Sequence, residues 1–279
     1  MSNGSGRRIA SVSNALRVLR VLAERPQGVG VTELAQLVGV GKSTAHLLLV
    51  TLADADFVGQ GDDGRYRLGL GAFEVGAAAV EVAAPGGPLT PLLRDLADRS
   101  GEAVSLATDS GRDAIIVQRF ESASVLRAEI RLGTRMPLHS SASGKYLLAW
   151  MPDERIDALF PGDELPAVTP HSIRSKQVLR EQLVEVRRQK YARNDDEYTV
   201  GISGVATGVT DANGHVAFAL SLAGPTHRFK CEDWIDDLTG TAAAMSEMLE
   251  GLAPPSVRAA RKTASGDAAR PQVDQGSPA

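Results

Sequence analysis

The 279-residue chain has little cysteine, no long apolar run and no excess of positive charge. Its single cysteine, Cys231, excludes an intrachain disulfide and fits a reducing compartment. No apolar run approaches the roughly 18 residues that cross a bilayer, and the N-terminal segment lacks the apolar core of a signal peptide. A formal net charge of −4 excludes a uniformly basic coat, so any contact with nucleic acid must be local. We therefore expect a cytoplasmic protein without a membrane partner.

Residue patterns that carry catalysis or bind a metal are also lacking. His139, His171, His215 and His227 are not spaced as paired ligands on one helix. The serines that follow His139 lack the Gly-x-Ser-x-Gly pattern of a nucleophile elbow. The acidic run at residues 195–197 is compatible with a carboxylate cluster for a metal or with a solvated turn, and without paired ligands we favour the turn. These absences predict a protein that is not an enzyme and that needs no cofactor.

What the chain does contain is a helix–turn–helix pattern at residues 31–52. Thr32 is the predicted N-cap of the first helix, and apolar residues follow it at helical spacing. Gly39 tolerates the positive φ that ends this helix sharply. A second helix begins near Lys42, and its first turn is rich in hydroxyls and free N–H groups, which suit phosphate oxygens and base edges. The pattern alone is equally compatible with a helical hairpin in some other domain.

The neighbouring sequence favours a DNA-binding domain. A helix with apolar residues at residues 12–22 closes before Pro26, and two short extended runs flank the glycine turn at 61–64, as in the wing of a winged helix. Residues 1–70 carry eight Lys and Arg against six Asp and Glu. Arg7 and Arg8 belong either to an arm that touches phosphates or to a solvated tail. The predicted DNA-contacting residues are Thr32, Lys42, Ser43, Thr44, Ala45, His46, Leu47, Arg65, Tyr66 and Arg67.

A second, larger domain is predicted after a linker helix. Residues 70–84 read as a helix that ends before the Pro-Gly-Gly-Pro breaker at 85–88. Its alanines and valines predict packing against a second copy, with burial against its own C-terminal domain as the alternative. We then expect helices at 89–99, 141–151, 152–160, 175–190 and 231–252, and strands at 103–108, 114–120, 125–132, 202–210 and 216–223. The turn at 211–214 predicts a hairpin, and the Pro-, Ala- and Gly-rich residues 253–279 predict a disordered tail.

Several short motifs in a fixed order resemble the IclR-type (isocitrate lyase regulator) family over nearly the whole chain. They are Ser43–His46, Gly64–Gly69, Arg131–Lys145, Asp195–Glu197, Gly201 and Ser221–Pro225. The resemblance implies an α+β protein with a winged helix-turn-helix, a linker helix and a GAF-like effector domain, whose mixed or antiparallel sheet is flanked by helices. We divide the chain into an arm (1–10), a winged helix (11–69), a linker (70–87), an effector-binding domain (88–252) and a tail (253–279).

The resemblance also implies where an effector binds. The family's pocket is lined by the loop after the third strand, the start of the next helix and two late strands, and N–H groups at that helix start suit an anion. Carried over by position, the effector-binding residues are Leu132, Gly133, Met136, Ser141, Ala142, Ser143, Gly144, Asn194, Gly204, Ser221 and Ala223.

This sequence departs from the family pattern at both sites. Relatives that bind small keto acids carry an acid, a cysteine and a serine where this chain has Asn194, Gly204 and Ala223. We therefore expect an effector larger or more apolar than glyoxylate or pyruvate, such as an aromatic acid, a sugar derivative or a lactone. At the DNA surface, Leu47 stands where relatives place an arginine and Gly41 replaces a common proline. Leu47 suits a thymine methyl rather than a phosphate.

Two functions are compared on this basis. The first is a ligand-responsive transcriptional regulator, a repressor in preference to an activator, that controls a catabolic or metabolic operon. It binds palindromic double-stranded operator DNA as a homodimer or tetramer. The second is a GAF-like redox enzyme of the methionine sulfoxide reductase sort, fused to a helical module. That enzyme needs reactive cysteines, and a lone Cys231 argues against it.

Overall fold

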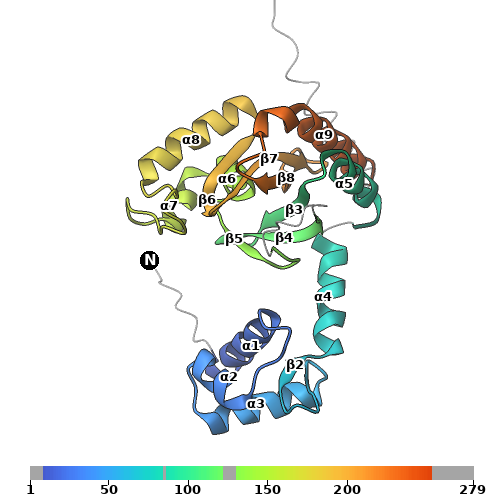
Figure 1. Cartoon of the computed structure of the whole chain (residues 1–279), viewed down its shortest axis with the longest axis vertical. Helices are drawn as coiled ribbons and strands as arrows, with labels where there is room; N and C mark the ends of the chain where they lie inside the picture. The colour runs from blue at the N-terminus through green and yellow to red at the C-terminus, as the bar shows by residue number, and fades with distance from the viewer. Residues whose placement is uncertain (1–8, 84–85, 122–129, 253–279) are drawn as a thin grey trace, which may run out of the picture. The chain divides into compact units, whose positions relative to one another are not determined.

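The computed structural model describes residues 9–83, 86–121 and 130–252. The chain divides between residues 83 and 84 into two compact units, and the elements of each are labelled in Figure 1. The division falls inside the segment predicted as a linker. The predicted tail and the residues Arg7 and Arg8 lie outside the described residues.

The first unit is a winged helix. Helices α1 (Ala10–Ala23), α2 (Val31–Val38) and α3 (Lys42–Asp54) precede an antiparallel hairpin of β1 (Val58–Gln60) and β2 (Tyr66–Leu68). Val29 and Tyr66 exchange two backbone hydrogen bonds, which add a short third extended segment beside the hairpin. The core of this unit is formed by Val18, Leu22, Val29, Leu34, Val38, Leu49, Val58 and Tyr66. Three helices and a wing were predicted, and this prediction is confirmed.

The helix ends in this unit follow from local backbone chemistry. Gly39 adopts the left-handed conformation (φ 72°), and its N–H bonds to the carbonyls of Ala35 and Gln36, which ends α2 as predicted. The predicted N-cap at Thr32 is wrong, because α2 begins at Val31 after Gly30, and no side chain caps it. The bridge that holds Val29 extended allows the helix to begin immediately afterwards, so Thr32 lies exposed within the first turn.

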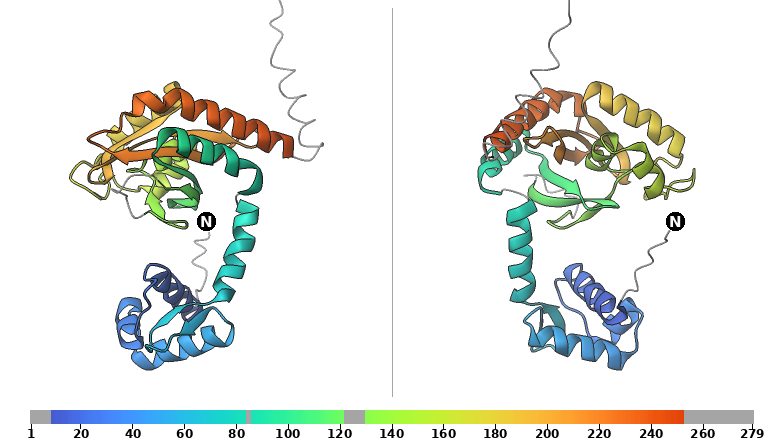
Figure 2. Two further views of the ribbon diagram at one scale, coloured as in Figure 1. Left: turned by 45° about the vertical axis from the view of Figure 1, so that its right-hand side comes forward. Right: turned by 180° about the vertical axis from the view of Figure 1, so that it is seen from behind.

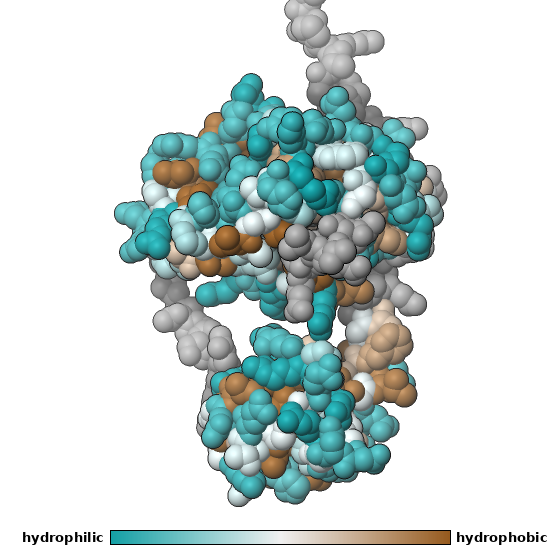
Figure 3. Space-filling model, in the orientation of Figure 1, coloured by the Kyte–Doolittle hydropathy of each residue, from teal (hydrophilic) through white to brown (hydrophobic). Residues whose placement is uncertain are grey.

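Helix α4 (Leu70–Ala83) leaves the wing through two glycines. A Cβ on Gly69 would lie 2.2 Å from the carbonyl oxygen of Asp56, and the N–H of Gly71 donates to the same oxygen. Any larger residue at position 69 therefore forces this turn apart. The first turns of α4 expose three large apolar side chains, those of Leu70, Phe73 and Val75. Figure 3 shows this apolar surface on the helix.

The second unit is a six-stranded antiparallel sheet with helices on both faces. Its strands are β3 (Ala103–Asp109), β4 (Asp113–Phe120), β5 (Arg135–Pro137), β6 (Ala192–Thr199), β7 (Ile202–Thr210) and β8 (Val216–Pro225), in the order β5-β4-β3-β8-β7-β6. Gly214 (φ 81°) closes the predicted hairpin between β7 and β8. The arrangement is the predicted α+β class.

Each face of this sheet has its own apolar core. Helix α5 (Gly86–Ser100) and helix α9 (Ile235–Leu252), which follows the short 3₁₀ turn η1 (Cys231–Trp234), cover one face with leucines, alanines and Met245. Figure 2 shows α5 and α9 side by side on that face. The opposite face is covered by α6 (Ala142–Ala149), α7 (Asp153–Leu159) and α8 (Lys176–Gln189). The strand residues of the predicted ligand site, which are Asn194, Gly204, Ser221 and Ala223, belong to this second face, because they alternate in step with the alanines of its core.

Three predicted elements need correction. Of the strand predicted at 125–132, residues 125–129 lie outside the described residues, and 130–132 are not a strand, because Gly133 (φ 79°) makes a turn and pairing with β4 begins only at Arg135. Strand β6 was not predicted, and the solvated turn at 195–197 is wrong because Asp195 pairs with Ser203 of β7 and Glu197 is buried against Lys145 of α6. Helix α5 begins at Gly86, before the predicted 89, because a proline in a first turn breaks no helical hydrogen bond.

Candidate nucleic-acid interface and ligand site

The first candidate site is the exposed face of α3. Lys42, Ser43, Thr44, His46 and Leu47 are all exposed. The N-cap residue is Gly41, which supplies no side-chain cap, so the first-turn N–H groups of α3 carry their partial positive charge uncapped by a side chain. Leu47 is 66% exposed, so its side chain is accessible to a partner on this face.

Two residues from the predicted set lie elsewhere. Ala45 has no exposed surface and Tyr66 is 8% exposed, and both pack toward the interior of the winged helix. Ala45 is one residue from Thr44 on a helix, so its side chain points about 100° away from the exposed face. Both side chains pack in the core of the winged helix and so position the exposed residues beside them on α3 and β2.

The wing is fastened to the loop between α1 and α2 by its two arginines. Arg65 donates to the carbonyl of Gly28 (3.1 Å), and Arg67 donates to the carbonyl of Gln27 (2.9 Å). Arg67 also forms an ion pair with Asp63 (2.6 Å), and this pair holds the pKa of Asp63 down at about 2. Arg67 therefore positions the wing and has part of its charge offset, while both guanidinium groups remain near the surface.

The second candidate site is a row of side chains across three strands. Asn194 on β6 pairs with Gly204 on β7, and Gly204 pairs with Ala223 on β8. Directly paired residues in antiparallel strands point to the same face, and Ser221, two residues from Ala223, joins them there. The side-chain oxygen of Asn194 accepts the N–H of Glu197 (2.9 Å). The sequence thus brought the late-strand residues of the predicted pocket together.

The start of α6 adjoins this row and is built from buried serines. The Ser141 hydroxyl caps the helix by accepting the N–H of Gly144 (3.1 Å), and it donates to the carbonyl of Pro137 (2.9 Å). Gly144 is required here because a Cβ would lie 2.6 Å from the backbone of Leu138. Ser141 and Gly144 are therefore committed to the cap, and the N–H groups of Ala142 and Ser143 are the first-turn donors that the Ser141 hydroxyl does not cap.

The remaining predicted residues lie on the segment that leads to α6. Gly133 forms a turn whose N–H bonds to Ile116 (2.8 Å), and Met136 is buried in the core of this face. Leu132 is 65% exposed and does not point into the core. Met136 is thus a core residue of this face, whereas Leu132 lies on the surface of the described region.

Two models of known families match this chain. The IclR helix-turn-helix domain matches residues 11–62, and the C-terminal domain of the bacterial transcriptional regulator IclR matches residues 88–250. The chain belongs to the IclR family.

Curated relatives and solved structures agree with this assignment. XynR of Escherichia coli K12 is 33% identical over 226 residues, which cover 79% of this chain and 88% of that protein. The transcriptional repressor IclR of the same organism is 32% identical over 223 residues, covering 79% and 81%. The structure of an IclR regulator from Alicyclobacillus acidocaldarius has a TM-score of 0.75 at 27% identity, and covers 87% of this chain and all of that one. This IclR-family chain is therefore a DNA-binding transcriptional regulator.

Two buried charged groups on this face of the sheet were not predicted from the sequence: the Lys145–Glu197 ion pair and the guanidinium of Arg119. The ammonium of Lys145 lies 2.7 Å from a carboxylate oxygen of Glu197 and 3.0 Å from the amide oxygen of Gln182. On β4, the side chain of Arg119 is only 5% exposed and donates to the hydroxyl of Ser105 (2.8 Å). Ser105 pairs with Ser221, so this guanidinium lies on the same sheet face as the predicted pocket. The sequence signal for Arg119 was its single charge within the strand predicted at 114–120.

The enzyme alternative finds no support in this IclR-family chain. Cys231 is 2% exposed, and burial raises the pKa of its thiol to about 11, so it is almost wholly protonated at neutral pH. Among the described residues, no group of three or more His, Cys, Asp or Glu side chains is placed to hold a metal ion.

The helices of this IclR-family chain were also compared with the length and apolarity of a membrane span. Of those that the structure describes, none reaches them by itself. Only α2 and α3 taken together do, and that pair is bent by 105°.

Proposed function

We propose that this regulator is a repressor of a catabolic or metabolic operon that binds a palindromic operator as a homodimer or tetramer. The observation that carries the proposal is the exposed face of α3, with its uncapped first turn and its exposed Leu47. Relatives named as repressors, among them the E. coli IclR repressor, support the sign of the regulation. Paired recognition helices in successive major grooves require a two-fold symmetric protein.

The DNA contacts in this proposal divide by chemistry. Lys42, Ser43 and Thr44 bind phosphates through side chains and helix N–H groups, with Thr32 of α2 and the wing arginines Arg65 and Arg67 beside them. His46 and Leu47 face the base edges. Leu47 contacts a thymine methyl, so the operator contains an A·T pair at the position where an arginine prefers guanine. Ala45 and Tyr66 serve only as supports.

The effector in this proposal is an organic acid with a sizeable apolar body. The free N–H groups of Ala142 and Ser143 bind its anionic group. Gly204 and Ala223 contribute no polar side chain, and the side-chain oxygen of Asn194 already accepts the N–H of Glu197. A pocket with these walls favours apolar bulk over the second polar group of a small keto acid. Binding shifts operator affinity by a coupling free energy of about 1–3 kcal/mol.

DNase footprinting on the gene's own upstream region tests the function as a whole. We expect a protected palindrome whose half-sites are spaced by about one helical turn or a multiple of it, and loss of protection in the double variant Lys42→Ala, Ser43→Ala. Aromatic acids, sugar acids and lactones added in turn identify the effector by loss of protection. The absence of any protected site, with the folded wild-type protein in excess, contradicts the proposal.

Calorimetric titration tests the effector class separately. We expect no tight binding of glyoxylate or pyruvate to the wild type. The variant Asn194→Asp, Ala223→Ser restores two of the family's polar groups and is expected to bind them more tightly than the wild type. Tight binding of either keto acid by the unaltered protein contradicts the proposed effector class.

A further inference from the structure

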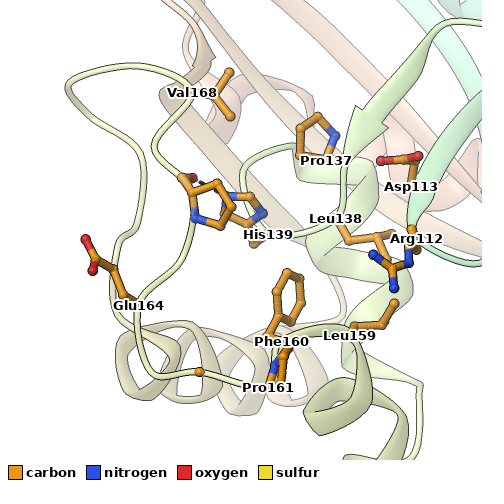
Figure 4. A pocket seen from close by; sticks show the side chains of 12 residues that line it. Arg112, Asp113, Pro137, Leu138, His139, Leu159, Phe160, Pro161, Glu164 and Val168 are labelled. Carbon is orange, nitrogen blue, oxygen red and sulfur yellow. Dashed lines mark hydrogen bonds between the residues drawn. The ribbon is translucent and has the colours of Figure 1, made fainter.

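The second unit also contains a pocket that shares no residue with the ligand site described above. Its volume is about 460 Å³, which is within the range of small-molecule sites. It opens between the β3–β4 turn, the segment after β5, and the end of α7 with the loop that follows it (Figure 4). Its walls are Arg112, Asp113, Pro137, Leu138, His139, Leu159, Phe160, Pro161, Gly162, Glu164, Pro166 and Val168.

The apolar part of this pocket is held in a fixed geometry. The rings of His139 and Phe160 pack edge to face with their centres 5.7 Å apart. The Nε2 atom of His139 lies 2.8 Å from the carbonyl oxygen of Pro166 and donates its N–H to that oxygen, which fixes the orientation of the ring. Leu138 is fully buried behind them. An aromatic or compact apolar group therefore meets a preformed surface and loses little free energy in ordering it.

The uncommitted charge at this pocket is positive. Arg112 forms no ion pair among the described residues, and Figure 4 shows its guanidinium between Leu138 and Leu159. Asp113 is already paired with Arg135 at 3.3 Å. The carboxylate of Glu164 points away from the other labelled side chains. A guanidinium beside an apolar wall is the arrangement that binds a carboxylate attached to an apolar body.

We propose that this pocket binds a second ligand, a carboxylic acid with an aromatic or compact apolar body. The carboxylate pairs with Arg112, and the body packs against Phe160, His139 and Pro137. The site is distinct from the family effector site and works beside it.

The wall of this pocket is continuous with the start of α6. The carbonyl of Pro137 accepts the hydroxyl of Ser141, and the backbone of Leu138 leaves no room for a Cβ on Gly144. A ligand that displaces residues 137–139 therefore shifts the turn that carries Ala142 and Ser143. This second step, in which the acid modulates the response to the effector, rests on the proposed function. The binding step does not.

Calorimetry on the full chain tests the binding step with 3-phenylpropionate and its neutral analogue 3-phenylpropionamide. We expect the acid to bind at least about tenfold more tightly than the amide, because only the acid pairs with Arg112. Arg112→Gln and Phe160→Ala are each expected to weaken binding of the acid by about tenfold or more. Arg174→Gln, at an exposed arginine of the same unit outside the pocket, is the matched control and leaves the affinity of the Arg112 site unchanged.

A crystal soaked with 3-(4-bromophenyl)propionate locates the ligand through the anomalous signal of bromine. The proposal requires bromine beside Phe160. It is overturned if the acid does not bind, if Arg112→Gln leaves its affinity unchanged, or if bromine lies only beside Ser143 and Ala223 and not beside Phe160. It is also overturned if Arg112→Gln and Phe160→Ala change only the sedimentation of the protein, because a second copy then covers this surface.

Operator binding separates this inference from the proposed function. If wild-type protein without ligand fails to bind its upstream DNA, the proposed function fails while acid binding at Arg112 stands. If DNA binding is sound, 3-phenylpropionate changes the operator Kd of the wild type and leaves that of Arg112→Gln unchanged. An equal change in both proteins contradicts the coupling to α6.

Discussion

At the scale of single residues, the most consequential feature is the ion pair between Lys145 and Glu197. Their side chains are 3% and 10% exposed, and 52 residues separate them in sequence. Burial lowers the pKa of Lys145 and raises that of Glu197, while the attraction between them opposes both shifts. The second carboxylate oxygen of Glu197 is buried without a protein partner. The pair therefore joins α6 to β6 at a cost in desolvation that only the intact pair offsets.

Removing one member of this pair is expected to be severely destabilising. Lys145→Met leaves a buried carboxylate without its cation, and we expect a loss of about 3–5 kcal/mol in the free energy of unfolding. The double variant Lys145→Met, Glu197→Leu removes both charges and is expected to recover much of that loss. Denaturant unfolding of the three proteins measures it. A single variant that loses less than about 1 kcal/mol shows that the pair is not a structural join.

A second residue-scale prediction concerns the stability of the protein in mild acid. His139 is 4% exposed, and burial lowers its pKa below the ordinary 6.5. Below pH 6.5 the unfolded chain binds a proton that the folded chain resists, so the contribution of His139 is full above pH 6.5 and is lost as pH falls toward the folded pKa.

We therefore expect the wild type to lose up to about 1.4 kcal/mol more per pH unit below 6.5 than the variant His139→Gln, which cannot titrate. Unfolding free energies at about pH 7.5 and about pH 5.5 give the comparison. Equal losses in both proteins indicate that His139 charges freely in the folded state.

At the scale of elements, the wing provides the sharpest test of the DNA surface. Arg67→Gln is expected to weaken operator binding by up to about tenfold and to lower the salt slope by roughly 1, since one phosphate contact is lost. Asp63→Asn removes the carboxylate that offsets Arg67 and is expected to act in the opposite direction. Arg20→Gln, at an exposed arginine of α1, is the control. Fluorescence anisotropy across a salt series measures the operator affinity and its salt dependence. Identical salt slopes for Arg67→Gln and the wild type would show that Arg67 does not contact the DNA.

The elements also show which parts of the fold a sequence can disclose. The wing and the β7–β8 hairpin were predictable because their turns require glycine at positive φ, and a glycine leaves a local mark. Strand β6 was missed because its acidic residues resemble a solvated turn. Glu197 is buried only because Lys145 reaches it from α6, and no local pattern records a contact across 52 residues. The candidate sites show the same contrast. The serines at the start of α6 were predicted from family motifs, whereas the position of Arg119 and the pocket in Figure 4 depend on strand register and packing.

At the scale of the whole molecule, the question is how many copies act together. Helix α4 begins with Leu70 74% exposed, Phe73 70% exposed and Val75 59% exposed. Leu70 and Phe73 are three residues apart and share one face of the helix, whereas Val75 projects from another face. In the proposed dimer, the same face of a second copy would cover Leu70 and Phe73. Under the proposed function, such a contact would let a regulator with one recognition helix per chain bind a palindrome, because the symmetry of a dimer matches that of the DNA.

The variant Phe73→Glu tests this assembly directly. In a two-fold interface the substitution acts twice, and each buried phenylalanine contributes about 1.5–3 kcal/mol, so we expect dimer dissociation to become at least about a hundredfold easier. Val184→Glu places the same charge at a valine of α8 with 61% exposure and is the matched control. Sedimentation velocity across a dilution series reports the dimer, and band shifts on a full palindrome and on one half-site report its consequence. The variant is expected to lose its preference for the full palindrome while still binding the half-site weakly. If it stays dimeric at every concentration, the interface lies on another surface of the chain.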